Sequence, residues 1–123
     1  MSGQAKPRLV LVVDDDEMIR RLVRAVLEAG EFEVTEARDG QTALQLASEA
    51  QPSVVVLDVM MPGLDGVEVC RRLDHDQVKV VVLTARDDPR LEAEARLAGA
   101  DAFMTKPFAA MELLDLVGEL MAR

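Results

Sequence analysis

Polar side chains able to do chemistry follow four of the short apolar runs in this sequence, each close to the point where the run ends. They are Asp14, Asp15 and Asp16 after the first run, Asp58 after the third, Thr84 after the fourth and Lys106 after the fifth. If the runs are parallel strands of one sheet, their carboxyl ends share one edge, where ligand sites form. We therefore expect several carboxylates, one hydroxyl and one ammonium group to converge there.

That combination of groups suits phosphoryl transfer assisted by a cation. Clustered carboxylates repel one another and raise at least one pKa unless a cation neutralises them. Because all the candidate ligands are hard oxygens, Mg²⁺ is favoured over a soft metal. A carboxylate can act as the nucleophile and form an acyl phosphate. Mg²⁺ and Lys106 would offset charge on the transferring group, and Thr84 could hydrogen-bond one of its oxygens.

The elements that must position these groups alternate along the chain. The predicted strands are Leu9–Val13, Phe32–Glu36, Val54–Leu57, Lys79–Leu83 and Asp101–Met104. The third and fourth strands contain two VVVL runs with no polar alternation, which is typical of strands covered on both faces in a parallel sheet.

Helical patterns separate the predicted strands. The first has an apolar stripe of Ile19, Leu22, Val23, Val26 and Leu27, with Gly30 just past its end. The others are predicted at Gln41–Ala50, after Gly66, at Pro89–Ala98 and at Ala110–Met121. The pattern is an α/β (βα)₅ fold, a doubly wound parallel sheet with right-handed crossovers and helices on both faces. We assign residues 1–8 to an N-terminal leader and residues 9–123 to one domain.

The composition restricts the binding partners and the cellular compartment expected for this domain. The formal charge is −9 over 123 residues, which argues against direct nucleic-acid binding by the domain itself. Cys70 is the only cysteine, so an intramolecular disulfide is impossible, which fits a reducing compartment. No apolar run approaches the roughly 20 residues needed to span a bilayer. The sequence therefore predicts a cytoplasmic protein that does not enter a membrane.

Four segments, in this order and spacing, resemble the receiver domain of bacterial response regulators: LVLVVDDD, VVLDVMMPGLDG, VVLTA and GADAFMTKPF. The resemblance runs from about Leu9 to Arg123 and implies a flavodoxin-like sheet with strand order 2-1-3-4-5. It also implies a phosphoacceptor signalling switch of the two-component, phosphorelay type. Such a module is not an enzyme acting on a separate substrate, because it catalyses only its own phosphorylation and dephosphorylation.

The resemblance implies a role for each acidic position. Asp58 is the expected phosphoacceptor, and Mg²⁺ is the expected cofactor. Asp15 is expected to bind the metal directly together with Asp58, while Asp14 supports it through water. The backbone carbonyl of Met60 is expected to complete the protein ligands.

The resemblance also implies how the phosphoryl group is bound and sensed. Thr84 and Lys106 are expected to bind it, and the Lys106–Pro107 bond is expected to be cis. Thr84 and Phe103 form the expected switch, which changes the surface made by the fourth helix, the fifth strand and the fifth helix. The implied phosphodonor is a sensor histidine kinase, a phosphotransfer protein or a small phosphodonor. The implied output is a downstream effector protein or a C-terminal output domain beyond Arg123.

Three other functions compete with this interpretation. A phosphatase of the aspartyl-phosphate type needs a second acid two residues after its nucleophile, where this chain has Met60. An unphosphorylated interaction module on the same fold typically loses the acidic pair, the acceptor or the lysine, and this chain keeps them all. A flavodoxin-like nucleotide binder would need a glycine-rich loop after the first strand, and three aspartates stand there instead.

Some residues are better explained by structure than by chemistry. Asp16 and Asp65 are predicted to cap helices. Cys70 is predicted to be a small buried hydrophobe, and His75 a solvated loop residue. Residues 73–79 look a few positions short for the family, at the sheet edge opposite the site.

Overall fold

The architecture comes from a computed structural model that describes residues 8–61, 63 and 65–123. Strands and helices alternate along the whole of this range. In chain order they are β1 (Leu9–Val13), α1 (Glu17–Ala29), β2 (Glu33–Ala37), α2 (Gly40–Ala50), β3 (Val54–Leu57), α3 (Gly66–Arg72), β4 (Lys79–Thr84), α4 (Pro89–Leu97), β5 (Ala102–Thr105) and α5 (Ala110–Ala122). The predicted (βα)₅ order is confirmed.

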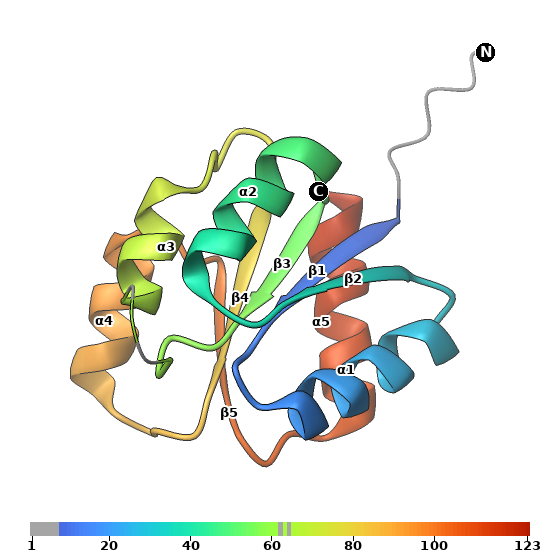
Figure 1. Ribbon diagram of the computed structural model, residues 1–123. Helices are drawn as coiled ribbons and strands as arrows, with labels where there is room; N and C mark the ends of the chain where they lie inside the picture. The colour runs from blue at the N-terminus through green and yellow to red at the C-terminus, as the bar shows by residue number, and fades with distance from the viewer. Residues whose placement is uncertain (1–7, 62, 64) are drawn as a thin grey trace.

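The five strands form one parallel sheet in the order β2-β1-β3-β4-β5. This is the flavodoxin-like order that the family resemblance implies. Figure 1 shows α1 and α5 on one face of the sheet and α2, α3 and α4 on the other. All the carboxyl ends of the strands therefore lie at one edge, between the two layers of helices.

The valine-rich strands supply both hydrophobic cores, because successive side chains of a strand point to opposite faces. Val10 and Val12 belong to the core under α1 and α5, whereas Leu11 and Val13 belong to the core under α2, α3 and α4. Strands β3 and β4 divide their apolar residues between the two cores in the same way. A strand with two buried faces has no place for polar alternation, which explains the VVVL runs.

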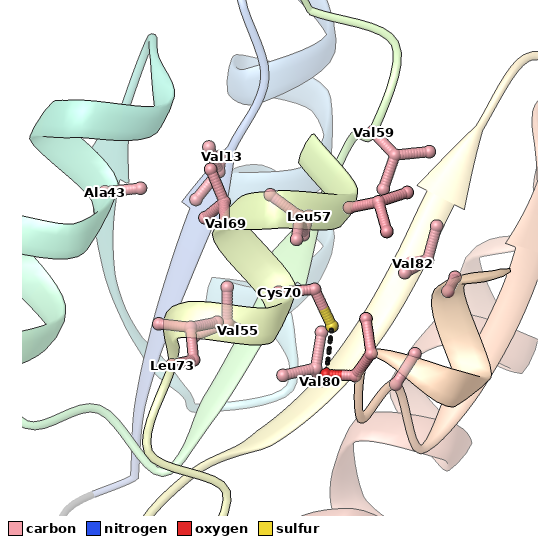
Figure 2. Close-up of a cluster of buried hydrophobic side chains, with 14 of the residues drawn as sticks. Val13, Ala43, Val55, Leu57, Val59, Val69, Cys70, Leu73, Val80 and Val82 are labelled. Carbon is pink, nitrogen blue, oxygen red and sulfur yellow. Dashed lines mark hydrogen bonds between the residues drawn. The ribbon is translucent and has the colours of Figure 1, made fainter. Parts of the chain in front are cut away.

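Cys70 lies within the core under α2, α3 and α4, as Figure 2 shows. Its side chain is fully buried, and its thiol donates a weak hydrogen bond to the Ala98 carbonyl at 3.7 Å. Burial raises the pKa of the Cys70 thiol to about 11. A thiol held protonated in this way packs as a small apolar group, which confirms the interpretation of Cys70.

The predicted caps are also confirmed. The Asp16 carboxylate accepts a hydrogen bond from the Met18 backbone N–H at 2.9 Å at the start of α1. The Asp65 carboxylate accepts one from the Val67 N–H at 2.9 Å at the start of α3. These bonds satisfy backbone donors of the first helical turn and fix where each helix begins.

Three strands, β2, β4 and β5, differ from the prediction by one residue at one or both ends, since hydrogen bonds to neighbouring strands decide these boundaries. Strand β2 begins at Glu33 because the Phe32 N–H donates to the Leu27 carbonyl and closes the end of α1 instead. Strand β4 extends to Thr84 and β5 to Thr105, and these two residues are paired. Thr84 is therefore the last residue of its strand.

Gly30 follows α1 as predicted, but it does not supply the left-handed turn that usually favours glycine there. Its φ is −87°, and the positive φ of 67° falls on Glu31. A Cβ at Gly30 would lie 2.6 Å from the Leu114 Cδ2 of α5. The absence of a Cβ at Gly30 thus permits the close approach of α5.

The interpretation of His75 as a solvated loop residue is wrong. Its ring is half-buried, and Nε2 lies 2.6 Å from the Cys70 carbonyl oxygen. Gly99 adopts a φ of 112°, and a Cβ there would lie 2.4 Å from the His75 Cε1. The short segment between α3 and β4 therefore folds back on the end of α4. It lies at the amino end of β4, opposite the edge where the polar residues gather.

The predicted leader falls almost entirely on residues 1–7, which lie outside the described residues, so it stays a prediction. Arg8, its last residue, contacts the domain: its guanidinium carbon lies 4.4 Å from the centre of the Phe32 ring. Within the described part of the chain, none of the helices has the length and apolar character needed to cross a membrane.

We expect Gly66→Ala to lower the free energy of unfolding by about 1–3 kcal/mol, the usual cost of overpacking. A Cβ at Gly66 would lie 2.3 Å from the Val59 Cα, so the loop that follows Asp58 would have to move. Urea unfolding measures the change.

Gly118→Ala in α5 is the matched control. Its Cβ would meet nothing closer than the Phe32 Cζ at 4.0 Å, so the helix should gain about 0.5–1 kcal/mol instead. Equal stabilities for the two variants would contradict the packing argument.

Candidate functional site

The acidic loop after β1 begins inside the hydrogen-bond pattern of the sheet. The Asp14 N–H donates to the Ala37 carbonyl of β2 at 3.2 Å, which continues the ladder one residue past the strand. The Asp14 side chain is buried, and its Oδ1 accepts from the Asp16 N–H at 2.9 Å. Asp15 is exposed. The loop thus places one carboxylate inside the edge of the sheet and the next one at its surface.

Asp58 occupies the equivalent position after β3. Its N–H donates to the Val13 carbonyl at 2.9 Å, so Asp58 is held beside the end of β1. Asp58 is only 6% exposed, and its Oδ1 accepts from the Met60 N–H at 2.8 Å. Met60 is 44% exposed beside this buried carboxylate.

The structure brings Asp14, Asp15 and Asp58 together as the sequence predicts. One carboxylate oxygen from each lies within 4.8 Å of the others. Three carboxylates at such distances carry more negative charge than one lysine offsets, and hard oxygen donors are those that Mg²⁺ prefers. The donor set therefore fits a small divalent cation.

Lys106 provides the positive charge at this edge. Its Nζ lies 2.7 Å from the Asp14 Oδ2 and 3.5 Å from the Asp58 Oδ2. Burial acts to lower the pKa of Lys106, but the hydrogen bond to Asp14 and the nearby carboxylate charges outweigh it and raise that pKa. Lys106 is therefore charged at neutral pH. The Lys106–Pro107 bond is cis, which confirms the expectation.

The environment of Asp58 disfavours its ionised form. Burial is the largest cause and raises its pKa; the Met60 N–H opposes this, the Asp14 charge adds to it, and Lys106 opposes it. The net direction is upward. Lys106 and Met60 therefore offset only part of the cost of burying this carboxylate.

Thr84 and Phe103 lie close to this edge, but the contacts described for them are with backbone groups and with the hydrophobic core rather than with the carboxylates. Thr84 is fully buried, its backbone carbonyl accepts from the Lys106 N–H at 2.7 Å, and its hydroxyl accepts from the Arg86 N–H at 3.4 Å. Phe103 pairs with Val82 across the sheet and packs, half-buried, against the core under α2, α3 and α4. Thr84 is thus joined to Lys106 through the backbone.

Arg20 and Glu36 are not among the site residues predicted from the sequence. Arg20 Nη1 donates to the Asp14 backbone carbonyl at 2.8 Å, and its Nε donates to Glu36 Oε1 at 3.1 Å. A basic residue in the second turn of the helix that follows the acidic loop was the available signal. The apolar stripe of that helix gives no indication of this contact.

Comparison with known proteins agrees with this geometry. Residues 10–118 match the family model of the response regulator receiver domain. The chain is 45% identical over 119 residues to the response regulator MprA of Mycolicibacterium vanbaalenii, a match that covers 95% of this chain and 52% of MprA. The chain therefore spans about half the length of the curated relatives it matches.

Solved structures give the same result. The receiver domain of the Francisella response regulator 1452 is 35% identical, with a TM-score of 0.85 over 94% of this chain and 97% of that one. The Vibrio cholerae chemotaxis protein CheY4 is 31% identical, with a TM-score of 0.84 over 91% of this chain and 97% of that one. Both the fold and the sequence are thus similar to theirs.

We expect Asp58→Asn to raise the free energy of unfolding at neutral pH in Mg²⁺-free buffer. The pKa of Asp58 is raised in the folded state, so the folded protein holds this proton more tightly than the unfolded chain does. The ionised carboxylate therefore costs stability above the folded pKa, and the cost fades as the pH falls toward the unfolded pKa of about 4.

Urea unfolding at neutral pH and near that unfolded pKa measures this effect. The advantage of the variant over wild type should shrink at the lower pH. Asp16→Asn is the control, because it removes one charge from the acidic loop while keeping a residue that caps α1 well. A variant at Asp58 that is less stable than wild type at neutral pH would contradict the prediction.

Proposed function

We infer that this chain, which belongs to the response regulator receiver domain family, is a switch that accepts a phosphoryl group on Asp58 with Mg²⁺ bound beside it. Receiver domains are the phosphoacceptor modules of two-component signalling. One observation carries the assignment to Asp58: this buried carboxylate lies where two other carboxylates and the Lys106 ammonium group converge. A carboxylate so placed has both a nucleophilic oxygen and positive charge within reach.

We assign the metal ligands to the acidic cluster. Asp15 and Asp58 would bind Mg²⁺ directly, Asp14 would support it through water, and the Met60 backbone carbonyl would complete the protein ligands. Bound Mg²⁺ would supply positive charge to the transferring group and to the crowded carboxylates. The convergence of three carboxylate oxygens within 4.8 Å supports this assignment.

In the proposed transfer, an Asp58 oxygen attacks the phosphorus atom of the donor. The new O–P bond forms while the bond from phosphorus to the leaving group breaks, and the leaving group keeps that electron pair. Lys106 offsets charge on the phosphoryl oxygens, and the Thr84 hydroxyl donates to one of them. The protein needs no further catalytic group, since phosphoryl transfer depends mostly on positioning and on neutralising charge.

The donor and the output follow from the family. We propose a sensor histidine kinase or a phosphotransfer protein as donor, with small phosphodonors able to replace it. Because the chain spans about half the length of its relatives, the output is either a C-terminal domain or a separate effector protein. We propose a cytoplasmic setting, and with a net charge of −9 we assign no nucleic-acid binding to this domain itself.

We expect acetyl phosphate with Mg²⁺ to add one phosphoryl group to the wild-type protein, measured by intact-protein mass spectrometry. Asp58→Asn removes the nucleophile and should abolish the added mass, and EDTA should block it in wild type. Asp65→Asn is the control, because asparagine also caps helices and Asp65 lies outside the cluster. Stoichiometric labelling of the Asp58 variant, or full labelling in EDTA, would refute the assignment.

We further propose that Thr84 and Phe103 carry the signal to the surface formed by α4, β5 and α5. The Thr84 hydroxyl now accepts from the Arg86 N–H, just before α4. To bind a phosphoryl oxygen it has to turn, and this leaves room for Phe103 to move inward. Phenylalanine has no hydroxyl, so packing rather than a hydrogen bond must carry the change.

We expect beryllofluoride, a mimic of the phosphoryl group, to shift the backbone NMR signals of residues 85–110 in the presence of Mg²⁺. The signals of strand β2 (Glu33–Ala37), at the far edge of the sheet, should change little. Asp58→Asn with the same additions controls for non-specific effects. Unchanged chemical shifts across residues 85–110 in wild type would contradict the proposed switch between two conformations.

A further inference from the structure

The Asp14 carbonyl lies just past the point where the sheet can hydrogen-bond it. The Asp14 N–H still pairs with the Ala37 carbonyl, but β2 ends at Ala37. A backbone carbonyl at this depth needs a donor from elsewhere. Arg20 provides it from the second turn of α1, with Nη1 at 2.8 Å from the Asp14 oxygen. The peptide that joins Asp14 to Asp15 is therefore held by a side chain.

Arg20 is itself held from the opposite side. Its Nε donates to Glu36 Oε1 at 3.1 Å, and the other oxygen of Glu36 accepts from Arg24 Nη1 at 2.7 Å. The Arg20 and Glu36 side chains are only 14% and 24% exposed. Hydrogen bonds from Arg24, and less strongly from Arg20, lower the pKa of Glu36 against the effect of burial, so Glu36 is ionised at neutral pH. The planar guanidinium thus bridges β2 and the acidic loop.

We propose that Arg20 is a positioning residue that fixes the Asp14–Asp15 peptide, and so holds both carboxylates where they bind a divalent cation together with Asp58. Its contacts are with the backbone of the cluster and with Glu36, so its action on the metal is indirect. The inference rests on the proposed function, since it takes the cation at this site as given. Groups that orient metal ligands from behind commonly change metal affinity by about 10–100-fold.

The charge of Arg20 and its positioning role predict opposite changes in cation affinity when Arg20 is removed. The inference can therefore be tested by the direction of that change. Arg20 carries a positive charge close to the acidic cluster, so by Coulomb repulsion alone its removal would strengthen cation binding. If Arg20 fixes the loop, its removal must weaken binding, because Asp14 and Asp15 lose their defined position. The direction of the change therefore separates the two effects.

The experiment is calorimetric titration of the unphosphorylated protein with Mg²⁺. We expect Arg20→Ala to weaken binding about tenfold. Arg20→Lys keeps the charge but lacks the planar pair of donors, so we expect a loss of intermediate size. Arg21→Ala is the matched control: it removes the next positive charge along α1, from a side chain 74% exposed and paired only with Glu17 among the described residues. It should bind Mg²⁺ as tightly as wild type or slightly more tightly.

A second measurement separates positioning from loss of folding. The backbone amide signals of Asp15 and Asp16 in the metal-free protein should shift in the Arg20 variants and stay in place in Arg21→Ala. If Arg20→Ala does not fold, the lysine variant decides the question in its place. Arg20 variants that bind Mg²⁺ as tightly as wild type would overturn this inference alone. A wild-type protein that binds no Mg²⁺ would overturn the proposed metal site, and this inference with it.

Discussion

Burying two like charges at one edge of the sheet is the constraint on which the rest of this structure depends. Asp14 and Asp58 are 3% and 6% exposed, and a single ammonium group lies between them. Removing carboxylates from water is costly even when a partner is present, and the raised pKa of Asp58 shows that the partner does not fully compensate. The two cores on either side of the sheet must supply the stability that this edge loses. The divalent cation that we propose for this site would relieve repulsion that already exists between the carboxylates.

The precision of the site comes from the hydrogen-bond pattern of the sheet. Asp14, Asp58 and Lys106 each donate their backbone N–H to the carbonyl at or next to the end of an adjacent strand. Their side chains therefore start from positions fixed by the valine-rich ladder rather than by mobile loops. Loops tolerate substitution because little holds them, whereas a residue bonded into the ladder has one position. Where the ladder runs out, at the Asp14 carbonyl, Arg20 takes over as donor.

The parts of the structure that depend on periodicity and on strand ends could be predicted from the sequence. The two-sided burial of VVVL and the meeting of Asp14, Asp15 and Asp58 follow from a parallel sheet whose carboxyl ends share an edge, whereas the strand order was implied by the family resemblance. Contacts between distant segments could not be predicted in the same way. The burial of His75 depends on a glycine at position 99, and the role of Arg20 depends on Glu36, sixteen residues further along the chain. Neither contact produces a periodic sequence pattern, since each joins one side chain to a single residue elsewhere in the chain.

The route by which the site can reach α4 is short and made of specific contacts. The Thr84 hydroxyl accepts from the Arg86 N–H, and the Arg86 side chain pairs with Asp88 at 3.3 Å. The Asp88 carboxylate also caps α4, accepting from the Arg90 N–H at 2.9 Å. A threonine that turns toward Asp58 gives up the first of these bonds, and the other two are made by residues within six positions of Thr84. Coupling between sites needs an element that both of them bias. We propose that the segment between Thr84 and the first turn of α4 is that element, because it borders the proposed phosphoryl site at one end and begins the α4 surface at the other.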